Sequence, residues 1–441
     1  PVFDCIYNYL TLIIDTTTST TTNTTTSTST NTTMYSNDVK IAVMGAMSHI
    51  LTNFGACVDV GNVLRLLLFK CLAMDSIRNI TLKTLITICN GEYTRQSMDL
   101  SHCYSNEALQ VLLGYLAPNT NNDSNTNATN ATNTSNTVYS RSTKCLTMQL
   151  VYLLLELSDT SDTSDRYRYT LTLDIRSNLL GVMTDYLSDS DWYYTTQALM
   201  VLHTLCRKYY TTIMYTTLYP ILLKLIFSPL LTSGNVNLNN MNTNLCVISG
   251  SSGSSGSNTP IALLNYCLVD IATQTQQKGS SSSSCSYSVI FKDLLGFNVD
   301  NMQHSEVCKV MQNTATSIVC MVEASKNTTI GTNTNTNTNT TASGTINCSI
   351  EDEVASHVVS QLSNCLSTIA TPATSDSTTT NANIENQLLF AVICVAGVFG
   401  NLPMETASQG MATVTPLLIQ CFNSTVDAIK MNAAKSLGQM I

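Results

Sequence analysis

Residues Leu64–Arg78, LRLLLFKCLAMDSIR, align without a gap with residues Pro416–Lys430, PLLIQCFNSTVDAIK, near the other end of the chain. Each stretch is an apolar run followed by an acidic residue and then by isoleucine and a basic residue, so Asp75 aligns with Asp427. A shorter form of the same ending is present at Asp38-Val39-Lys40. Self-similarity on the scale of two helices is typical of repeat proteins, in which neighbouring repeats bury each other's apolar faces. The sequence therefore predicts an all-α helical solenoid.

Apolar residues recur at helical spacing after the basic residue of each ending. The predicted buried face consists of Val39, Val43, Met47, Ile50 and Leu51 in the first copy, and of Ile429, Ala433, Leu437 and Met440 in the last. Asp38, Asp75 and Asp427 are predicted to begin these helices. A carboxylate at that position can accept hydrogen bonds from free backbone N–H groups and interacts favourably with the helix dipole.

The preceding helix contains an internal proline in two copies, at Pro220-Ile221-Leu222-Leu223 and at Pro416-Leu417-Leu418-Ile419. Proline inside a helix kinks it, because one backbone hydrogen bond is lost and the ring meets a carbonyl of the preceding turn. A kinked first helix packed on a straight second helix is typical of a HEAT repeat. The alternative from the same pattern is a globular bundle of ordinary amphipathic helices.

About eight helix pairs can be placed along one continuous HEAT-repeat array that covers residues 1–441. The predicted pairs join Pro1–Ile13 to Asp38–Phe54, Gly61–Ala73 to Asp75–Cys89, Asn106–Leu116 to Thr143–Leu157, Asp174–Leu187 to Trp192–Tyr209, Thr212–Leu231 to Pro260–Thr275, Tyr287–Asn298 to Ser305–Ser325, Glu351–Thr368 to Ile384–Phe399, and Ala407–Ser424 to Thr425–Ile441. A glycine and a proline in Gly400-Asn401-Leu402-Pro403 predict the end of the seventh pair.

Stretches rich in Thr, Asn, Ser and Gly interrupt this array and are predicted to be disordered insertions. They cover residues 16–33, 119–137, 232–259, 326–349 and 371–383. These stretches have few apolar side chains, so they cannot offset the entropy lost on ordering. A long insertion at the turn inside a helix pair adds only a slowly growing loop-closure cost, which explains how a solenoid can accommodate them.

Charge and hydropathy exclude several classes of protein. The chain has 20 basic and 29 acidic residues, a net charge of −9, and no basic cluster of the kind that binds DNA or RNA. No secretory signal opens the sequence. The apolar stretch Leu388–Gly400 is too short to span a bilayer, and Ile213–Leu231 contains Pro220 and Lys224. We therefore expect a soluble protein that binds neither nucleic acid nor membranes.

The sequence predicts no catalytic residue, no metal site, no cofactor and no small-molecule substrate. The 16 cysteines include no C-x-x-C pair, and most lie in helical runs, which is typical of buried thiols in the reducing cytoplasm or nucleus. None of the five histidines has metal-ligand spacing to cysteines or acidic residues; they are His49, His102, His203, His304 and His357. His304 near Glu306 is interpreted as a helix start. Phosphate-binding loops and nucleophile elbows are also absent from the sequence.

Four stretches resemble the cullin-associated and neddylation-dissociated proteins, which are HEAT-repeat regulators of cullin–RING ubiquitin ligases. They are Asp38–Cys89, Ser188–Gly234, Ser305–Ser325 and Asn386–Ile441, in the order of the middle of that family. Ser-Pro-Leu-Leu at 228–231 is the most specific element. The resemblance covers nearly all of the chain outside the low-complexity stretches, which are not part of the family pattern. It implies an internal fragment, roughly the middle third of such a protein.

The resemblance implies a non-catalytic scaffold that binds unmodified cullin–RING ligases, exchanges their substrate receptors and assembles SCF-type complexes. In that family the first repeats grasp the RING subunit, and a hairpin near the carboxyl end occupies the adaptor site of the cullin. Neither region corresponds to these residues, so the partner-binding residues stay unknown. The alternative is a carrier or adaptor solenoid, such as an importin-like transport receptor or a phosphatase scaffold.

Overall fold

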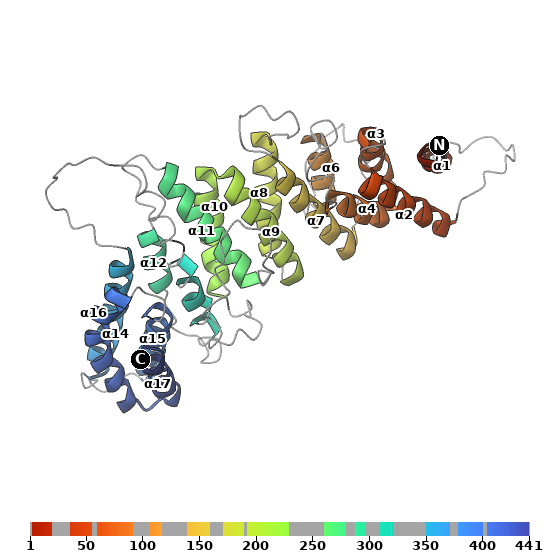
Figure 1. Ribbon diagram of the computed structural model, residues 1–441. Coiled ribbons are helices and arrows are strands. Elements are labelled where there is room, and N and C mark those ends of the chain that lie inside the picture. The colour runs from red at the N-terminus through yellow and green to blue at the C-terminus, as the bar shows by residue number, and fades with distance from the viewer. Residues whose placement is uncertain are drawn as a thin grey trace, which may run out of the picture. The chain divides into compact units, whose positions relative to one another are not determined.

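The computed structural model describes most of the predicted helical segments (Figure 1). The described residues are 2–19, 36–54, 60–90, 106–116, 139–158, 171–188, 192–228, 260–278, 287–296, 309–311, 313–318, 320–321, 324, 350–370, 378–399 and 404–440. All regular secondary structure within these ranges is helical, so the predicted all-α class is confirmed. The chain divides into two compact units, Pro1–Tyr209 and Tyr210–Ile441.

Unit 1 is a stack of helix pairs in chain order. Its helices are α1 (Val2–Ser19), α2 (Asn37–Phe54), α3 (Val60–Arg65) continued by the π-helix η2 (Leu66–Cys71), α4 (Arg78–Asn90), α6 (Asn106–Leu116), α7 (Arg141–Leu157), α8 (Leu173–Leu187) and α9 (Trp192–Tyr209). The second helices pack each on the next, α2 on α4, α4 on α7 and α7 on α9, while the first helices η2, α6 and α8 form the other layer. This nearest-neighbour packing is the defining property of a solenoid.

Unit 2 repeats the arrangement. Its helices are α10 (Thr212–Ile226), α11 (Pro260–Lys278), α12 (Tyr287–Leu295), helical residues between 309 and 324, α14 (Ile350–Ala370), α15 (Thr378–Phe399), α16 (Met404–Gln420) with the 3-10 turn η5 (Cys421–Asn423), and α17 (Asp427–Met440). First helices pack on first helices, as α12 on α14 and α14 on α16, and α15 packs on both its partner α14 and the following second helix α17.

The two aligned copies have the same local geometry. The N–H groups of Ile77 and Arg78 donate to the carbonyl of Met74, and those of Ile429 and Lys430 donate to the carbonyl of Val426. The two isoleucines are both buried, at 2% and 0% exposed. The gapless alignment made from sequence therefore marks equivalent positions in two repeats.

The predicted position at a helix start is confirmed for Asp38 and Asp427, which lie in the first turns of α2 and α17. Asp75 and Asp427 each pair with the basic residue three positions later, with N–O distances of 2.5 and 3.1 Å. The hydroxyl of Ser424 accepts the hydrogen bond of the Val426 N–H instead. A lysine or arginine one turn away competes successfully for a carboxylate, because it contributes a full charge. Helix α4 also begins later than predicted, at Arg78 rather than Asp75.

The predicted buried faces are correct in part. Met47, Leu51, Ile429 and Ala433 are buried, whereas Val39, Val43, Ile50 and Leu437 are only partly buried. The side chain of Met440 lies outside the described residues. Two fully buried residues were missed, Met44 in α2 and Ser436 in α17. The Ser436 hydroxyl donates to the carbonyls of Val392 and Asn432, so this polar side chain is satisfied inside the core.

Two predicted helices end early for local reasons. Helix α10 ends at Ile226 rather than Leu231, because Ser228 precedes a proline and such residues avoid helical geometry. Helix α12 ends at Leu295 rather than Asn298, where the N–H of Gly296 donates to the carbonyl of Lys292 at 2.7 Å. A Cβ at Gly296 would lie only 2.8 Å from the carbonyl oxygen of Lys292, so the absence of a side chain allows this close turn.

The low-complexity insertions lie largely outside the described residues. Helix α1 extends to Ser19 and helix α15 begins at Thr378, so each includes a few residues of a predicted insertion. The remaining residues of 16–33 and 371–383, together with 119–137, 232–259 and 326–349, are not described. Among the helices that are described, none is long and apolar enough to cross a membrane.

Helix α15 is the most enclosed element of unit 2. Residues Leu388–Val395 are all buried, from 0% to 8% exposed, because α14 packs on one side of the helix and α17 on the other. A helix that is apolar all round requires such enclosure. Gly410 of α16 approaches this helix closely: a Cβ there would lie 2.9 Å from Cζ of Phe399 and closer still to Cε1.

The close approach at Gly410 predicts that Gly410→Ala destabilises unit 2 by about 1–3 kcal/mol, since the buried Phe399 ring must move. Gly438→Ala in α17 is the matched control, because a Cβ there meets nothing within 4 Å. The control is expected to be neutral or to stabilise the helix by up to about 1 kcal/mol. Urea denaturation of both variants measures the difference. Equal effects would show that the two helices do not approach as closely as described.

The buried thiols predict a specific labelling pattern. Burial raises the pKa of Cys71 to about 12, against the weaker opposing effect of Lys70, so at pH 8 only roughly one thiol in ten thousand is ionised. Cys5 is exposed. In the native protein we expect iodoacetamide to modify Cys5 and to leave Cys71 and Cys394 unmodified, as measured by peptide mass spectrometry. Rapid modification of Cys71 in the folded protein would contradict its buried position.

The same thiol predicts a pH dependence of stability. Because the pKa of Cys71 is raised on folding from its ordinary 9.0, the protonated form is favoured in the folded state. Its contribution to the free energy of unfolding is full below about pH 9 and declines as the pH rises toward 12. In a Cys71→Ala variant the free energy of unfolding should fall less at alkaline pH than it does in the chain with Cys71. Urea denaturation at several pH values measures this difference.

Candidate functional site

The second helices of unit 1 begin at a common edge. The Thr143 hydroxyl near the start of α7 donates to Oδ1 of Asn79 near the start of α4, at 2.8 Å. The Arg141 guanidinium at the start of α7 lies 5.6 Å from the ring centre of Tyr193 in α9. We call this edge, where first helices end and second helices begin, the turn edge. Its members are Lys40, Ile41, Phe69, Lys70, Asp75, Arg78, Tyr115, Tyr139, Arg141, Lys144, Asp185, Tyr186, Tyr193 and Tyr194.

Arg78 is held between two tyrosines at this edge. Its guanidinium carbon lies 5.0 Å from the ring centre of Tyr115 and 4.9 Å from that of Tyr139, and the two rings meet edge to face. Its Nε donates to the carbonyl of Leu72 at 2.8 Å, and its side chain is only 11% exposed. Stacking of a partly buried guanidinium on aromatic faces is favourable, so the second and third pairs are joined here.

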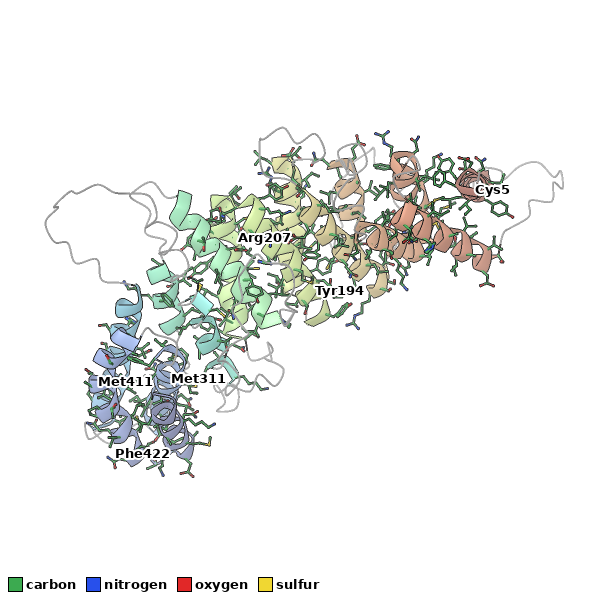
Figure 2. The ribbon with its side chains drawn as sticks, viewed as in Figure 1. Cys5, Tyr194, Arg207, Met311, Met411 and Phe422 are labelled. Atoms are coloured by element: carbon green, nitrogen blue, oxygen red, sulfur yellow. The ribbon has the colours of Figure 1, made fainter. Side chains whose placement is uncertain are left out.

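The following pair repeats this contact with different residues. The Lys144 ammonium lies 5.6 Å from the ring centre of Tyr186, and Tyr186 lies 5.4 Å from Tyr194, measured between ring centres. Arg141 stacks on Tyr193 and Tyr194. Figure 2 shows Tyr194 and Arg207 in unit 1; they belong to opposite ends of α9. The turn edge is thus a row of tyrosine rings and cations over several pairs.

The tyrosine hydroxyls of this row bind helix ends. Tyr115 donates to the carbonyl of Leu72, just after η2, at 3.0 Å, and Tyr186 donates to the carbonyl of Leu116, the last residue of α6, at 2.8 Å. Burial raises the pKa of Tyr115, opposed by the Arg78 guanidinium, so the phenol remains a protonated donor. Both contacts satisfy carbonyls that have no acceptor role inside their own helix.

A second network of hydrogen bonds lies at the opposite edge of unit 1, where α7 ends. Lys208 Nζ donates to the carbonyls of Leu155, Glu156 and Ser158, at 2.9, 2.5 and 3.0 Å. Arg207 binds both carboxylate oxygens of Glu156, at 2.6 and 2.7 Å. A lysine at a helix carboxyl end satisfies free carbonyls and favours the negative end of the dipole. This network is structural, since Lys208 is directed at backbone carbonyls and Arg207 at the carboxylate of Glu156.

The described residues contain no cluster of side chains suited to metal binding. No three side chains of His, Cys, Asp or Glu lie close enough there to hold a metal ion. His49 accepts a hydrogen bond from the side-chain amide of Asn53 in the same helix, and His102 and His304 lie outside the described ranges. At the surface this edge offers Tyr193 and Arg141, whereas Tyr115, Tyr186 and Arg78 are largely buried. Exposed tyrosine and arginine favour contact with another protein.

The sequence alone did not reveal the tyrosine row, although a signal was present. The first helices of the third and fourth pairs both end in Tyr-Leu, at Tyr115-Leu116 and Tyr186-Leu187. Aligned by their carboxyl ends, these helices place the tyrosines at one position. The second helices of the same pairs begin near Tyr139 and Tyr193. Comparing helix ends rather than helix faces would have found the row.

No family model matches the chain, and no curated protein matches its sequence. Solved structures similar to it include yeast importin-beta, with 10% identity and a TM-score of 0.37 over 98% of this chain and 47% of that one. A designed armadillo repeat protein is also similar, with 11% identity and a TM-score of 0.25 over 87% of this chain and 100% of that one. An engineered protein has 11% identity and a TM-score of 0.28 over 98% of both chains. The chain spans about half the length of the importin-beta structure.

The chain is an α-solenoid of the HEAT and armadillo type. The packing of first helices on first helices and second helices on second helices carries this assignment. Solenoids of this type present the ends and outer faces of many helices, and they are typically protein-binding scaffolds. The turn edge is therefore the candidate functional site of unit 1.

The network at the end of α7 predicts unequal effects for two neighbouring cations. Lys208→Met removes three hydrogen bonds to carbonyls and is expected to cost about 1.5–3 kcal/mol. Arg207→Met is the control; its ion pair with Glu156 is 46% and 30% exposed, so its loss should cost at most about 1 kcal/mol. Thermal unfolding of both variants measures the difference. A larger effect at Arg207 would assign the stability to the ion pair instead.

Proposed function

We propose that this protein is a non-catalytic scaffold that binds another protein along its helix ends. The observation that carries this proposal is the turn edge of unit 1, where tyrosines and cations recur in successive pairs. Tyrosine and arginine dominate the energetics of protein interfaces, because they contribute large contact area and directed hydrogen bonds. Binding by such an edge requires no chemistry on the partner.

The partner we propose is a cullin–RING ubiquitin ligase whose cullin lacks its ubiquitin-like modifier. This step is supported by the resemblance of Asp38–Cys89 and the three later stretches to the cullin-associated and neddylation-dissociated family. On this proposal the protein promotes exchange of substrate receptors and acts in the cytoplasm or nucleus. The absence of a membrane-crossing helix among the described residues is compatible with that location.

A stack of helix pairs has a physical route to this activity. Many modest contacts along a long surface can bury the several thousand Å² typical of stable complexes. A bulky modifier near that surface would exclude the scaffold sterically. Receptor exchange then follows from competition for overlapping cullin surface, because each ligand weakens the binding of the other by the same factor.

The proposal predicts selective recovery of unmodified cullin. The chain, immobilised, is incubated with purified cullin–RING complex in modified and unmodified forms, and the bound fractions are compared. We expect recovery of the unmodified form at least about tenfold above the modified form, a difference of about 1.4 kcal/mol.

A Tyr193→Asp variant tests whether the turn edge takes part, since this tyrosine is 39% exposed.

Equal recovery of the two cullin forms, or recovery of neither, would remove the cullin assignment. The remaining candidate would be a carrier or adaptor solenoid, tested by the same immobilised chain against a transport GTPase or a phosphatase catalytic subunit. Loss of cullin binding in Tyr193→Asp with unchanged thermal stability would support the turn edge as the contact surface. Unchanged binding in that variant would place the contact elsewhere.

A further inference from the structure

Helix α11 contains a buried amide that the surrounding protein satisfies at one end only. Asn265 is 1% exposed, and the hydroxyl of Ser317 lies 2.6 Å from its Oδ1. Its Nδ2 has no hydrogen-bond partner among the residues that the structure describes. Buried polar groups in folded proteins are nearly always hydrogen-bonded, because an unsatisfied one loses its bonds to water and gains none in return. Asn265 therefore needs a partner beyond these side chains.

Exchanging the two ends of this amide does not remove the need. The Ser317 hydroxyl also lies 2.9 Å from the backbone carbonyl of Asn313, and it has one proton to donate. If Ser317 donates to that carbonyl, the NH2 group of Asn265 can donate to Ser317, and the amide oxygen then takes the position without a partner. If Ser317 donates to Asn265 instead, the NH2 group takes that position. Within the described part of the chain, one polar end of the amide lacks a protein partner in both arrangements.

The helix segment that contains Ser317, residues 313–318, has further polar groups in the interior. Asn313, Thr314 and Ser317 are each 0% or 1% exposed. Because Asn313 and Thr314 precede Ser317 by four and three positions, all three lie on the same side of the segment. The Thr314 hydroxyl donates to the carbonyl of Val310 at 2.9 Å, so the lone pairs of its oxygen can still accept a hydrogen bond. A small molecule between this side and Asn265 can therefore both donate and accept hydrogen bonds.

We propose that a buried water molecule lies between Asn265 and helix segment 313–318 and forms hydrogen bonds with both. Water suits this position because it donates and accepts, so it satisfies either end of the amide. An ion suits it less, since the amides and hydroxyls named above carry no net charge to balance one. The proposal assigns an internal binding site, and it does not depend on the scaffold function or on the identity of the partner.

This water would complete a polar junction of three helices in unit 2. Nδ2 of Asn313 in the segment donates to the carbonyl of Ile226, the last residue of α10, at 3.3 Å. Ser317 joins the segment to α11 through Asn265. The water adds a second link between the segment and α11, so sliding either helix would break several hydrogen bonds together. We therefore expect a fixed register at this contact, where apolar packing alone would allow small shifts.

The direct test is a crystal structure of the full chain at a resolution that shows ordered water. We expect one water within about 2.7–3.2 Å of the free end of the Asn265 amide and of a side-chain oxygen of Asn313 or Thr314. A protein group in contact with that end of the amide, or a dry contact without a water, would overturn the inference.

A second test, in solution, compares serine with alanine at the same position. Asn265→Ser and Asn265→Ala leave similar space in the core, but the serine hydroxyl can bind the water that remains there. We therefore expect Asn265→Ser to have the higher midpoint of urea unfolding.

Cys267 provides the matched control, since it lies in the same helix and is 0% exposed. A hydroxyl buried without water is unfavourable, so Cys267→Ser should have a lower midpoint than Cys267→Ala. A midpoint of Asn265→Ser equal to or below that of Asn265→Ala would overturn the inference. Circular dichroism checks that all four variants fold.

Discussion

Helix-end carbonyls need hydrogen-bond donors from outside their own helix, and in this chain the next helix pair supplies them. Tyr115 reaches back to Leu72, Tyr186 to Leu116, and Lys208 to three carbonyls at the end of α7. In unit 2, Asn313 donates in the same way to Ile226, the last residue of α10. Apolar burial holds the layers together, but these polar contacts determine how far one pair can slide along another, because a displaced pair would leave several carbonyls unsatisfied.

The helices themselves could be predicted from periodicity. Helices α6 and α9 have the predicted bounds, and the alignment of Leu64–Arg78 with Pro416–Lys430 identified equivalent positions in two repeats. Details that depend on competition between side chains could not be predicted. The carboxylate of Asp75 pairs with the side chain of Arg78. Ser436 occupies a core position because carbonyls of α15 and α17 accept hydrogen bonds from its hydroxyl.

The candidate site was inaccessible from sequence for a geometric reason. Tyr115, Tyr139 and Arg78 come from three different helices or turns, and the packing of α6 on η2 and of α4 on α7 brings them together. Patterns within one helix report which face is buried, but they contain no information about which helix ends meet. The same limit applies to the opposite edge, where Glu156 and Arg207 belong to the second helices of different pairs.

The direction of the carbonyl contacts has a consequence for synthesis on the ribosome. In each case the donor is encoded after its acceptor, 43 residues later for Tyr115, 70 for Tyr186 and 87 for Asn313. In a nascent chain the carbonyls of Leu116 and Ile226 therefore stay exposed to water until their donors have emerged, a delay on the order of several seconds at roughly 5–20 residues per second. We therefore expect these two helix ends to become fully ordered only after the residues that donate to them have been synthesised.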